Sequence, residues 1–129
     1  MKISIVVDAN IIISALLGGV TAGVFFKGTF IFITSDFTIK EIEKYVLELS
    51  KKLGVSEDKL RSALELLPLK VVERREYESF LSKAAQMIKD PKDVPILALA
   101  LSLNLPLWTN DKHFDIVKEI LIIKTKDLV

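Results

Sequence analysis

Short apolar runs alternate with longer amphipathic segments along this chain, and this alternation limits the possible folds more than any other feature. Between the runs, apolar residues recur every three or four positions, which is the pattern of an amphipathic helix. Strands that alternate with helices form a parallel sheet covered by helices on both faces. We therefore predict an α/β fold with one domain over residues 1–129. About five strands are expected, at residues 3–7, 30–34, 69–72, 105–108 and 121–123.

The expected helices follow from apolar spacing and from residues that begin or end helices. Ser35 or Asp36 can cap one helix, Gly54 ends it, and Ser56 begins the next. The remaining helices are expected at residues 10–17, 21–27, 75–89 and 94–103, with a short one near Phe114.

Composition excludes several kinds of site. The 18 Lys and Arg residues nearly balance the 17 Asp and Glu residues, so attraction to phosphate must come from a local patch or a metal. The absence of cysteine excludes disulfides, thiol nucleophiles and iron–sulfur ligation. With a single histidine, a metal would have mostly oxygen ligands, which favours Mg²⁺ or Mn²⁺.

The apolar N-terminal stretch, residues 3–20, could be mistaken for a membrane span. Asp8 and Asn10 lie in its middle, and a buried aspartate is unfavourable in lipid. We predict a buried strand followed by a helix, in a cytoplasmic protein without a membrane partner. Half of the chain is hydrophobic, and Phe25, Phe26 and Tyr45 look exposed in the predicted helices, which suggests a homodimer or a protein partner.

Four acids lie where the predicted strands and helices would bring them together. Asp8 directly follows the first strand, and Asp111 follows the fourth. Glu41 lies early in the helix after the second strand, and Asp93 begins the helix that precedes the fourth. The carboxyl ends of parallel strands share one edge of the sheet, where ligands bind. We therefore expect the four carboxylates to converge.

Convergent carboxylates repel one another unless a cation binds or some of them are protonated. Mg²⁺ or Mn²⁺ relieves this repulsion, can activate a water and can stabilise the charge on a phosphodiester during hydrolysis. This chemistry needs no nucleophilic side chain, which fits a chain without cysteine. The acids therefore predict a metal-dependent nuclease.

Each of these residues also has a structural interpretation. Asp8 and Asp93 could cap the helices that follow them, Glu41 could lie on a charged helix face, and Asp111 could belong to a polar turn. Asn10 could orient a carboxylate or a water, or cap a helix.

The residues around the acids are less specific. Thr109 could donate a hydrogen bond to a neighbouring acid, whereas His113 is expected on the surface and Trp108 in the core. Asp115 is expected to be a solvated helix residue. Substrate contacts are expected from lysines near the sheet edge, namely Lys40, Lys92 and Lys112.

The segments that carry these acids resemble the PIN-domain family of nucleases in order and spacing. The matching segments are residues 6–11, 39–42, 90–95 with 98–100, and 107–112, within a resemblance that covers about residues 1–115. The family often has a further acid at the position of His113, so this chain departs from the family pattern there, although Asp115 is nearby.

The resemblance implies a three-layer α/β/α sandwich and Mg²⁺- or Mn²⁺-dependent ribonuclease activity. The metal ligands that it implies are Asp8, Glu41, Asp93 and Asp111. Many small prokaryotic members are VapC toxins of toxin–antitoxin pairs and form homodimers. An RNA substrate, a homodimer and an antitoxin partner are therefore expected.

Two other classes of α/β protein that use acids have patterns that can be tested at Asp8 and Asn10. A phosphatase with Asp8 as nucleophile would usually have a second aspartate where Asn10 stands, and a signal-receiver domain would have paired acids after the first strand. Both patterns are missing. A PIN-like module that binds or assembles without catalysis, or a structure-specific nuclease acting on DNA, fits the sequence as well.

Overall fold

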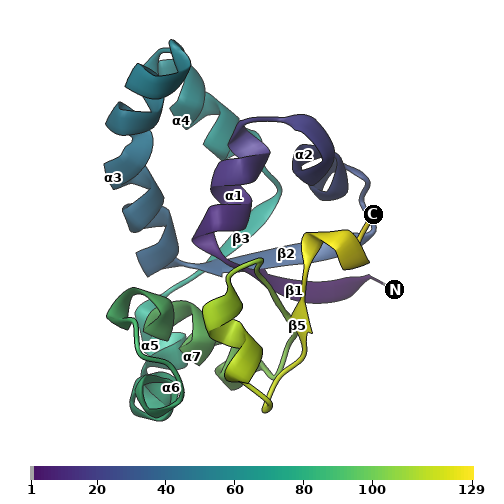
Figure 1. Ribbon diagram of the computed structural model, residues 1–129, viewed down its shortest axis with the longest axis vertical. Helices are drawn as coiled ribbons and strands as arrows, with labels where there is room; N and C mark the ends of the chain where they lie inside the picture. Colours follow the sequence, from purple (N-terminus) through teal and green to yellow (C-terminus); the bar gives the residue numbers. More distant parts are fainter. Residues whose placement is uncertain (1) are drawn as a thin grey trace.

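The computed structural model describes residues 2–129, which form a five-stranded, entirely parallel sheet (Figure 1). The strand order is β3-β2-β1-β4-β5, so the first strand lies at the centre of the sheet. The predicted α/β fold with about five parallel strands is confirmed. The strands are β1 (Ile3–Val7), β2 (Phe30–Ser35), β3 (Leu69–Val72), β4 (Leu107–Trp108) and β5 (Ile122–Ile123).

The helices follow the strands in the predicted alternation. The α-helices are α1 (Ala9–Leu16), α2 (Gly19–Phe26), α3 (Asp36–Leu53), α4 (Glu57–Leu66), α5 (Arg74–Tyr77), α6 (Leu81–Met87) and α7 (Val94–Leu103). Short 3₁₀ turns occupy Glu78–Phe80, Pro91–Asp93, Lys112–Ile116 and Thr125–Asp127.

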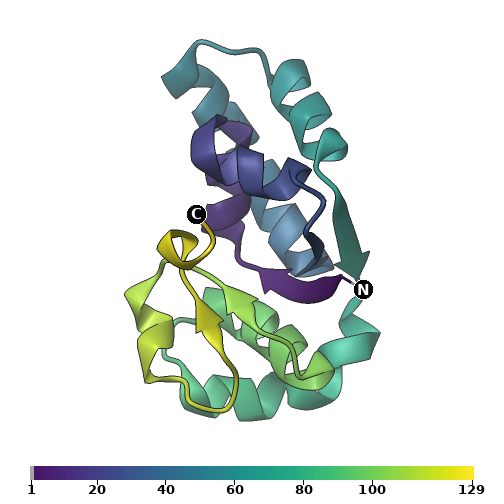
Figure 2. The ribbon, with the colours of Figure 1, turned by 90° about the vertical axis from the view of Figure 1, so that its right-hand side faces the viewer.

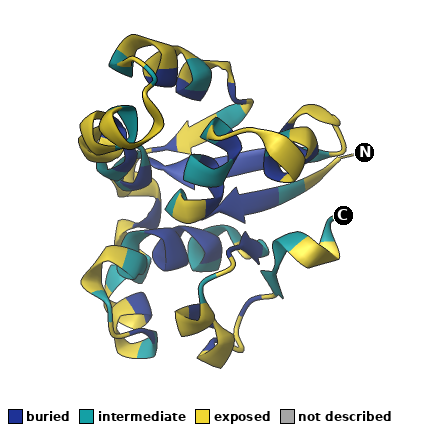
Figure 3. Cartoon of the chain, turned by 45° about the horizontal axis from the view of Figure 1, so that its top comes forward, coloured by how far each residue is buried: buried dark blue, intermediate teal, exposed yellow. Residues whose placement is uncertain are grey.

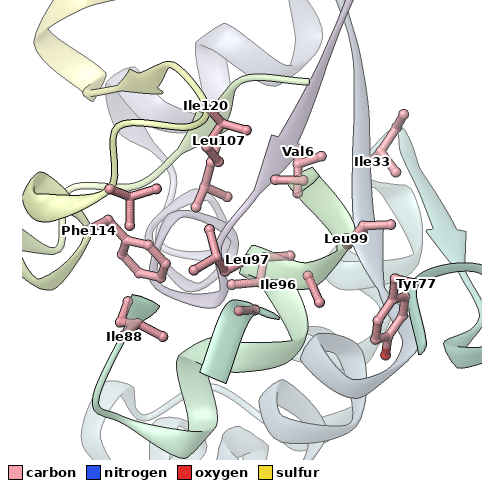
Figure 4. Packing of buried hydrophobic residues seen from close by; sticks show 14 of the residues in the cluster. Val6, Ile33, Tyr77, Ile88, Ile96, Leu97, Leu99, Leu107, Phe114 and Ile120 are labelled. Atoms are coloured by element: carbon pink, nitrogen blue, oxygen red, sulfur yellow. The ribbon is translucent and has the colours of Figure 1, made fainter. Parts of the chain in front are cut away.

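The sheet separates two hydrophobic clusters, because successive side chains of a strand point to opposite faces. Ile5 and Val7 of β1 pack with residues of α1, α2, α3 and α4 on one face. Val6, between them, packs with α7 and the chain around Phe114 on the other face (Figure 4). Two helical layers therefore enclose the sheet, whose strands are buried at the centre (Figures 2 and 3). The three-layer α/β/α sandwich is confirmed.

The helix predicted over residues 75–89 is wrong, because the chain breaks into α5, a 3₁₀ turn and α6. Tyr77 has φ −119° and ψ 0°, and Phe80 has φ −100° and ψ −3°. Tyr77 is buried, and its hydroxyl donates a hydrogen bond of 2.6 Å to Asp36 Oδ1 at the start of α3. This contact joins residues far apart in the sequence and holds Tyr77 at the break. The local spacing of apolar residues therefore could not predict the break.

The expectation that Phe25 is exposed is also wrong. Its ring packs against Phe32 and Trp108, with centroids 4.5 and 5.3 Å away, and Trp108 is buried as predicted. Phe26 and Tyr45 are exposed, at 60% and 40%.

No single helix within residues 2–129 is long and apolar enough to cross a membrane. Only α1 and α2 taken together, with a bend of 103° between them, reach the length and composition of a span.

Candidate functional site

A cleft of about 380 Å³ opens at the carboxyl edge of the sheet, and acids from distant parts of the chain line it. Adjacent strands β1 and β4 end here, and Asp8 N donates to the Trp108 carbonyl oxygen at 3.1 Å. The structure therefore brings the four predicted acids to one place. The acidic residues of the cleft are Asp8, Glu41, Glu48, Asp90, Asp93 and Asp111.

Asp8 is buried at the bottom of this arrangement and held by two donors. Its Oδ1 accepts a hydrogen bond of 2.8 Å from Ala9 N, and its Oδ2 accepts one of 2.7 Å from Thr109 Oγ1. Burial raises the pKa of Asp8 above its usual range despite these hydrogen bonds, and the nearby charge of Asp111 adds to the effect. Asp8 also begins α1, so its helix-capping role and its place in the cleft are compatible.

Thr109 connects two of the acids. Its hydroxyl donates to Asp8 and accepts a hydrogen bond of 3.1 Å from Asp111 N. Thr109 is fully buried between them. A single hydroxyl therefore orients one carboxylate and the backbone that carries the other.

Asp93 is the least satisfied acid of the cleft. Its Oδ2 is buried and has no hydrogen-bond partner among residues 2–129. Burial, together with the charges of Asp8, Asp90 and Asp111, raises the pKa of Asp93 to about 6, and the nearby His113 opposes this shift. The expected capping role is not seen, because the side chain makes no capping hydrogen bond. Asp90 instead caps the preceding turn and accepts from Lys92 N at 3.0 Å.

His113 lies at the rim of the acid cluster. Its side chain is 64% exposed, in agreement with the surface position expected, but its Nδ1 lies 3.6 Å from Asp93 Oδ2 and 3.5 Å from Asp111 Oδ1. One possible ligand atom from each of Asp90, Asp93 and His113 lies within 4.8 Å of the other two. Sequence reasoning gave neither Asp90 nor His113 a functional role. Their spacing was the available signal, since each lies two or three residues from a predicted metal ligand.

The other residues predicted from the sequence lie around the cluster of Asp8, Asp93 and Asp111. Glu41 is largely buried, one turn into α3, and its Oε1 accepts a hydrogen bond of 3.0 Å from Lys44 Nζ. Asn10 lines the cleft, as do Lys52 and, of the predicted substrate-contact lysines, Lys92. Asp115 is solvated as predicted, and it pairs with Lys124.

The donor set fits a divalent cation. All four predicted ligands are carboxylates, which are the ligands that Mg²⁺ and Mn²⁺ prefer. Asp93 Oδ2 is buried without a hydrogen-bond partner among the described residues, and the pKa of this carboxyl is raised, so negative charge is unfavourable here without a ligand. A bound cation would relieve this repulsion.

The family model for the PIN domain matches residues 6–126. The chain belongs to the PIN-domain family. PIN domains are generally nucleases, and the expected resemblance is confirmed over nearly the whole chain. No curated protein matches this PIN domain in sequence.

Solved structures share the fold of this PIN domain at low sequence identity. PAE2754 from Pyrobaculum aerophilum superposes with a TM-score of 0.74 at 17% identity, over 99% of this chain and 93% of that one. VapBC2 from Rickettsia felis, bound to a DNA fragment from its promoter, superposes at 0.71 and 16%, over 95% and 98%. A toxin–antitoxin complex from Klebsiella pneumoniae superposes at 0.66 and 20%, over 90% and 94%.

Proposed function

We propose that this PIN domain is a metal-dependent endoribonuclease that hydrolyses phosphodiester bonds. Asp8, Glu41, Asp93 and Asp111 would hold Mg²⁺ or Mn²⁺. One observation carries the proposal: acids distant in sequence line one cleft, and one of them keeps a buried oxygen without a hydrogen-bond partner among residues 2–129. Such an arrangement is unfavourable for folding and is understandable as a cation site.

The residues of the cleft would have different roles in such a reaction. When bound, the metal would supply an activated water and stabilise the charge that develops on the phosphate. Thr109 and Ala9 N hold the two Asp8 oxygens in place, so this ligand is oriented before any cation arrives. Lys52 and Lys92 line the cleft and can bind phosphates of the substrate. Asn10 can position the water.

Protein partners form the second part of the proposal. We propose that the chain is the toxin of a toxin–antitoxin pair, acts in the cytoplasm and forms a homodimer. Two structures of similar fold are a VapBC protein and a toxin–antitoxin complex, which supports an antitoxin partner. Tyr45 is 40% exposed and lines the cleft, so a protein partner that covered Tyr45 would contact the same cleft as the acids. Co-purification with the product of a short neighbouring reading frame would test the pair.

Cleavage assays test the catalytic part. Wild type, Asp8→Asn and the control Asp58→Asn would be incubated with Mg²⁺ or Mn²⁺ and a labelled RNA pool of random sequence, and in parallel with labelled DNA. Asp58 is exposed at the start of α4, at the far end of the molecule from β4 and β5 (Figure 1). We expect metal-dependent RNA cleavage by wild type and Asp58→Asn and none by Asp8→Asn.

The other outcomes separate the alternatives. Cleavage of DNA but not of RNA would show that the protein is a deoxyribonuclease. Metal binding without cleavage of either nucleic acid would favour a binding or assembly module. Wild-type activity in Asp8→Asn would show that the site is wrong.

A further inference from the structure

The single histidine of the chain lies against the acid cluster, and its chemistry differs from that of every neighbour. Carboxylates suit Mg²⁺ and Mn²⁺, whereas an imidazole nitrogen suits Zn²⁺, Ni²⁺ and other late transition metals. Adding one nitrogen donor to a carboxylate site therefore changes which ions it binds best.

We propose that His113, Asp90 and Asp93 form a transition-metal position that adjoins the four-carboxylate cleft and shares Asp93 with it. The inference deepens the proposed function, because it assigns a second ion to the same catalytic region. It also stands on contacts of its own, since neither Asp90 nor His113 belongs to the four predicted ligands.

The donor atoms of His113 and Asp93 have the spacing of two ligands of one ion, and the Asp90 atom lies within 4.8 Å of both. A tetrahedral ion with bonds of about 2.1 Å separates its ligand atoms by about 3.4 Å. His113 Nδ1 lies 3.6 Å from Asp93 Oδ2. A hydrogen bond between nitrogen and oxygen would be shorter, at about 2.7–3.2 Å. The pair is therefore too far apart for a good hydrogen bond and close to the separation that a shared cation imposes.

The oxygen of this pair, Asp93 Oδ2, makes no hydrogen bond within the described chain. Asp93 Oδ2 is buried, and no donor among residues 2–129 lies within hydrogen-bond distance of it. Burial of an unpaired carboxylate oxygen is unfavourable unless a cation compensates for it. The observation is independent of the grouping of the acids and points to a ligand at this atom.

Local contacts hold two of the three donors, His113 and Asp90, in place. The fully buried ring of Phe114 anchors the turn that carries His113, and His113 N donates to Asp111 Oδ1 at 2.9 Å. Asp90 is fixed by its hydrogen bond from Lys92 N. Little movement of the backbone is needed to bind an ion.

The position is also open to solvent. Asp90 lines both the acid cleft and a second hollow of about 490 Å³, and His113 lines the second hollow. An ion held here would therefore have three ligands from the chain and at least one side open to water or substrate, which is the pattern of catalytic rather than structural metal sites.

Proton NMR of the Co²⁺-loaded protein tests the proposal directly. An imidazole bound to Co²⁺ through Nδ1 keeps an exchangeable N–H whose resonance the ion shifts far outside the usual range. Because the chain has one histidine, a single such resonance would be unambiguous. We expect it in wild type and in Glu119→Gln, an exposed-residue control on the same side of the sheet, and expect its loss in His113→Ala. Its absence from Co²⁺-loaded wild type would overturn the proposal.

Calorimetry with Co²⁺ and Mg²⁺ gives the second test. His113→Ala should weaken Co²⁺ binding by about tenfold or more while leaving Mg²⁺ binding nearly unchanged. His113→Asp should keep metal binding and lower the ratio of Co²⁺ to Mg²⁺ affinity, because an oxygen donor replaces nitrogen. Equal losses for the two ions in His113→Ala would contradict a ligand role.

The two proposals fail separately. A shifted imidazole resonance in a protein that cleaves no RNA would leave the metal position standing and refute the ribonuclease. RNA cleavage by a protein whose Co²⁺ form lacks the resonance would support the ribonuclease and refute the metal position at His113.

Discussion

Asp36 and Asp93 are both acids near the carboxyl edge of the sheet, yet their surroundings differ. Asp36 accepts hydrogen bonds from Tyr77 Oη at 2.6 Å, Phe37 N at 2.8 Å and Arg74 N at 3.1 Å. Asp93 has a buried oxygen without a partner among the described residues. One acid is satisfied by donors of its own chain, and the other is left facing further acids.

Their pKa values shift in opposite directions. Burial alone would raise the pKa of Asp36, but hydrogen bonds from Tyr77, Phe37 and Arg74 outweigh it, with help from the charge of Lys40, and lower the pKa. Burial and neighbouring acids raise the pKa of Asp93 to about 6. Hydrogen-bond satisfaction therefore separates an acid that stabilises the fold from one that is available for a ligand.

The largest expected difference between the two acids is in catalysis. Asp93→Asn should reduce metal-dependent RNA cleavage by at least about a hundredfold, because it removes a proposed metal ligand. Asp36→Asn should retain wild-type cleavage per folded molecule, since Asp36 holds α3 to the chain around Tyr77. Initial rates on labelled RNA, corrected for the folded fraction by circular dichroism, would measure both. Similar losses of cleavage rate in the two variants would contradict the distinction between a structural Asp36 and a metal-binding Asp93.

A second prediction concerns the hydroxyl that connects Asp8 and Asp111. Thr109→Val keeps the shape of the side chain but removes its donor and its acceptor, so metal affinity should fall by about 10- to 100-fold. Thr109→Ser should restore most of it. Calorimetric titration with Mn²⁺ would show this; unchanged affinity in Thr109→Val would mean that Thr109 does not orient the ligands.

The smallest expected effects are on stability without metal, and they have opposite signs. Asp36→Asn should destabilise the protein at neutral pH by about 1–3 kcal/mol, because the amide cannot accept all three hydrogen bonds. Asp93→Asn should stabilise it by about 1 kcal/mol after solvent screening, because an uncompensated charge is removed. Urea unfolding in a metal chelator would measure both. Destabilisation by Asp93→Asn would contradict the assignment.

The pH dependence of the same measurement follows from the pKa shifts. Because folding raises the pKa of Asp93, its contribution to stability is fully present below about pH 4 and is lost as the pH rises through about 6. Because folding lowers the pKa of Asp36, its contribution is present above about pH 4 and is lost as the pH falls. Asp93→Asn should therefore remove the decline that wild type shows between about pH 4 and 6.

Much of the fold could be predicted because it depends on local patterns. The apolar run of β1 and the helical spacing of α3 are determined by nearby residues. The break at Tyr77 and the burial of Phe25 could not be predicted, because contacts with Asp36, Phe32 and Trp108 determine them.

The site shows the same division. Asp8 and Asp111 were placed correctly in one cleft because parallel strands end at one edge. The sequence could not show that Asp36 is satisfied and Asp93 is not, since two of the Asp36 donors, Arg74 and Tyr77, lie far away in the chain. Nor could it show that His113 turns toward Asp93, because that depends on how the turn around Phe114 packs.

Titration of Mn²⁺ into metal-free wild type, Asp36→Asn and Asp93→Asn at neutral pH would test most directly whether the unsatisfied acids form the metal site. We predict saturable binding of similar affinity in wild type and Asp36→Asn, and loss of that binding in Asp93→Asn. No binding by wild type, or equal weakening in the two variants, would contradict this account.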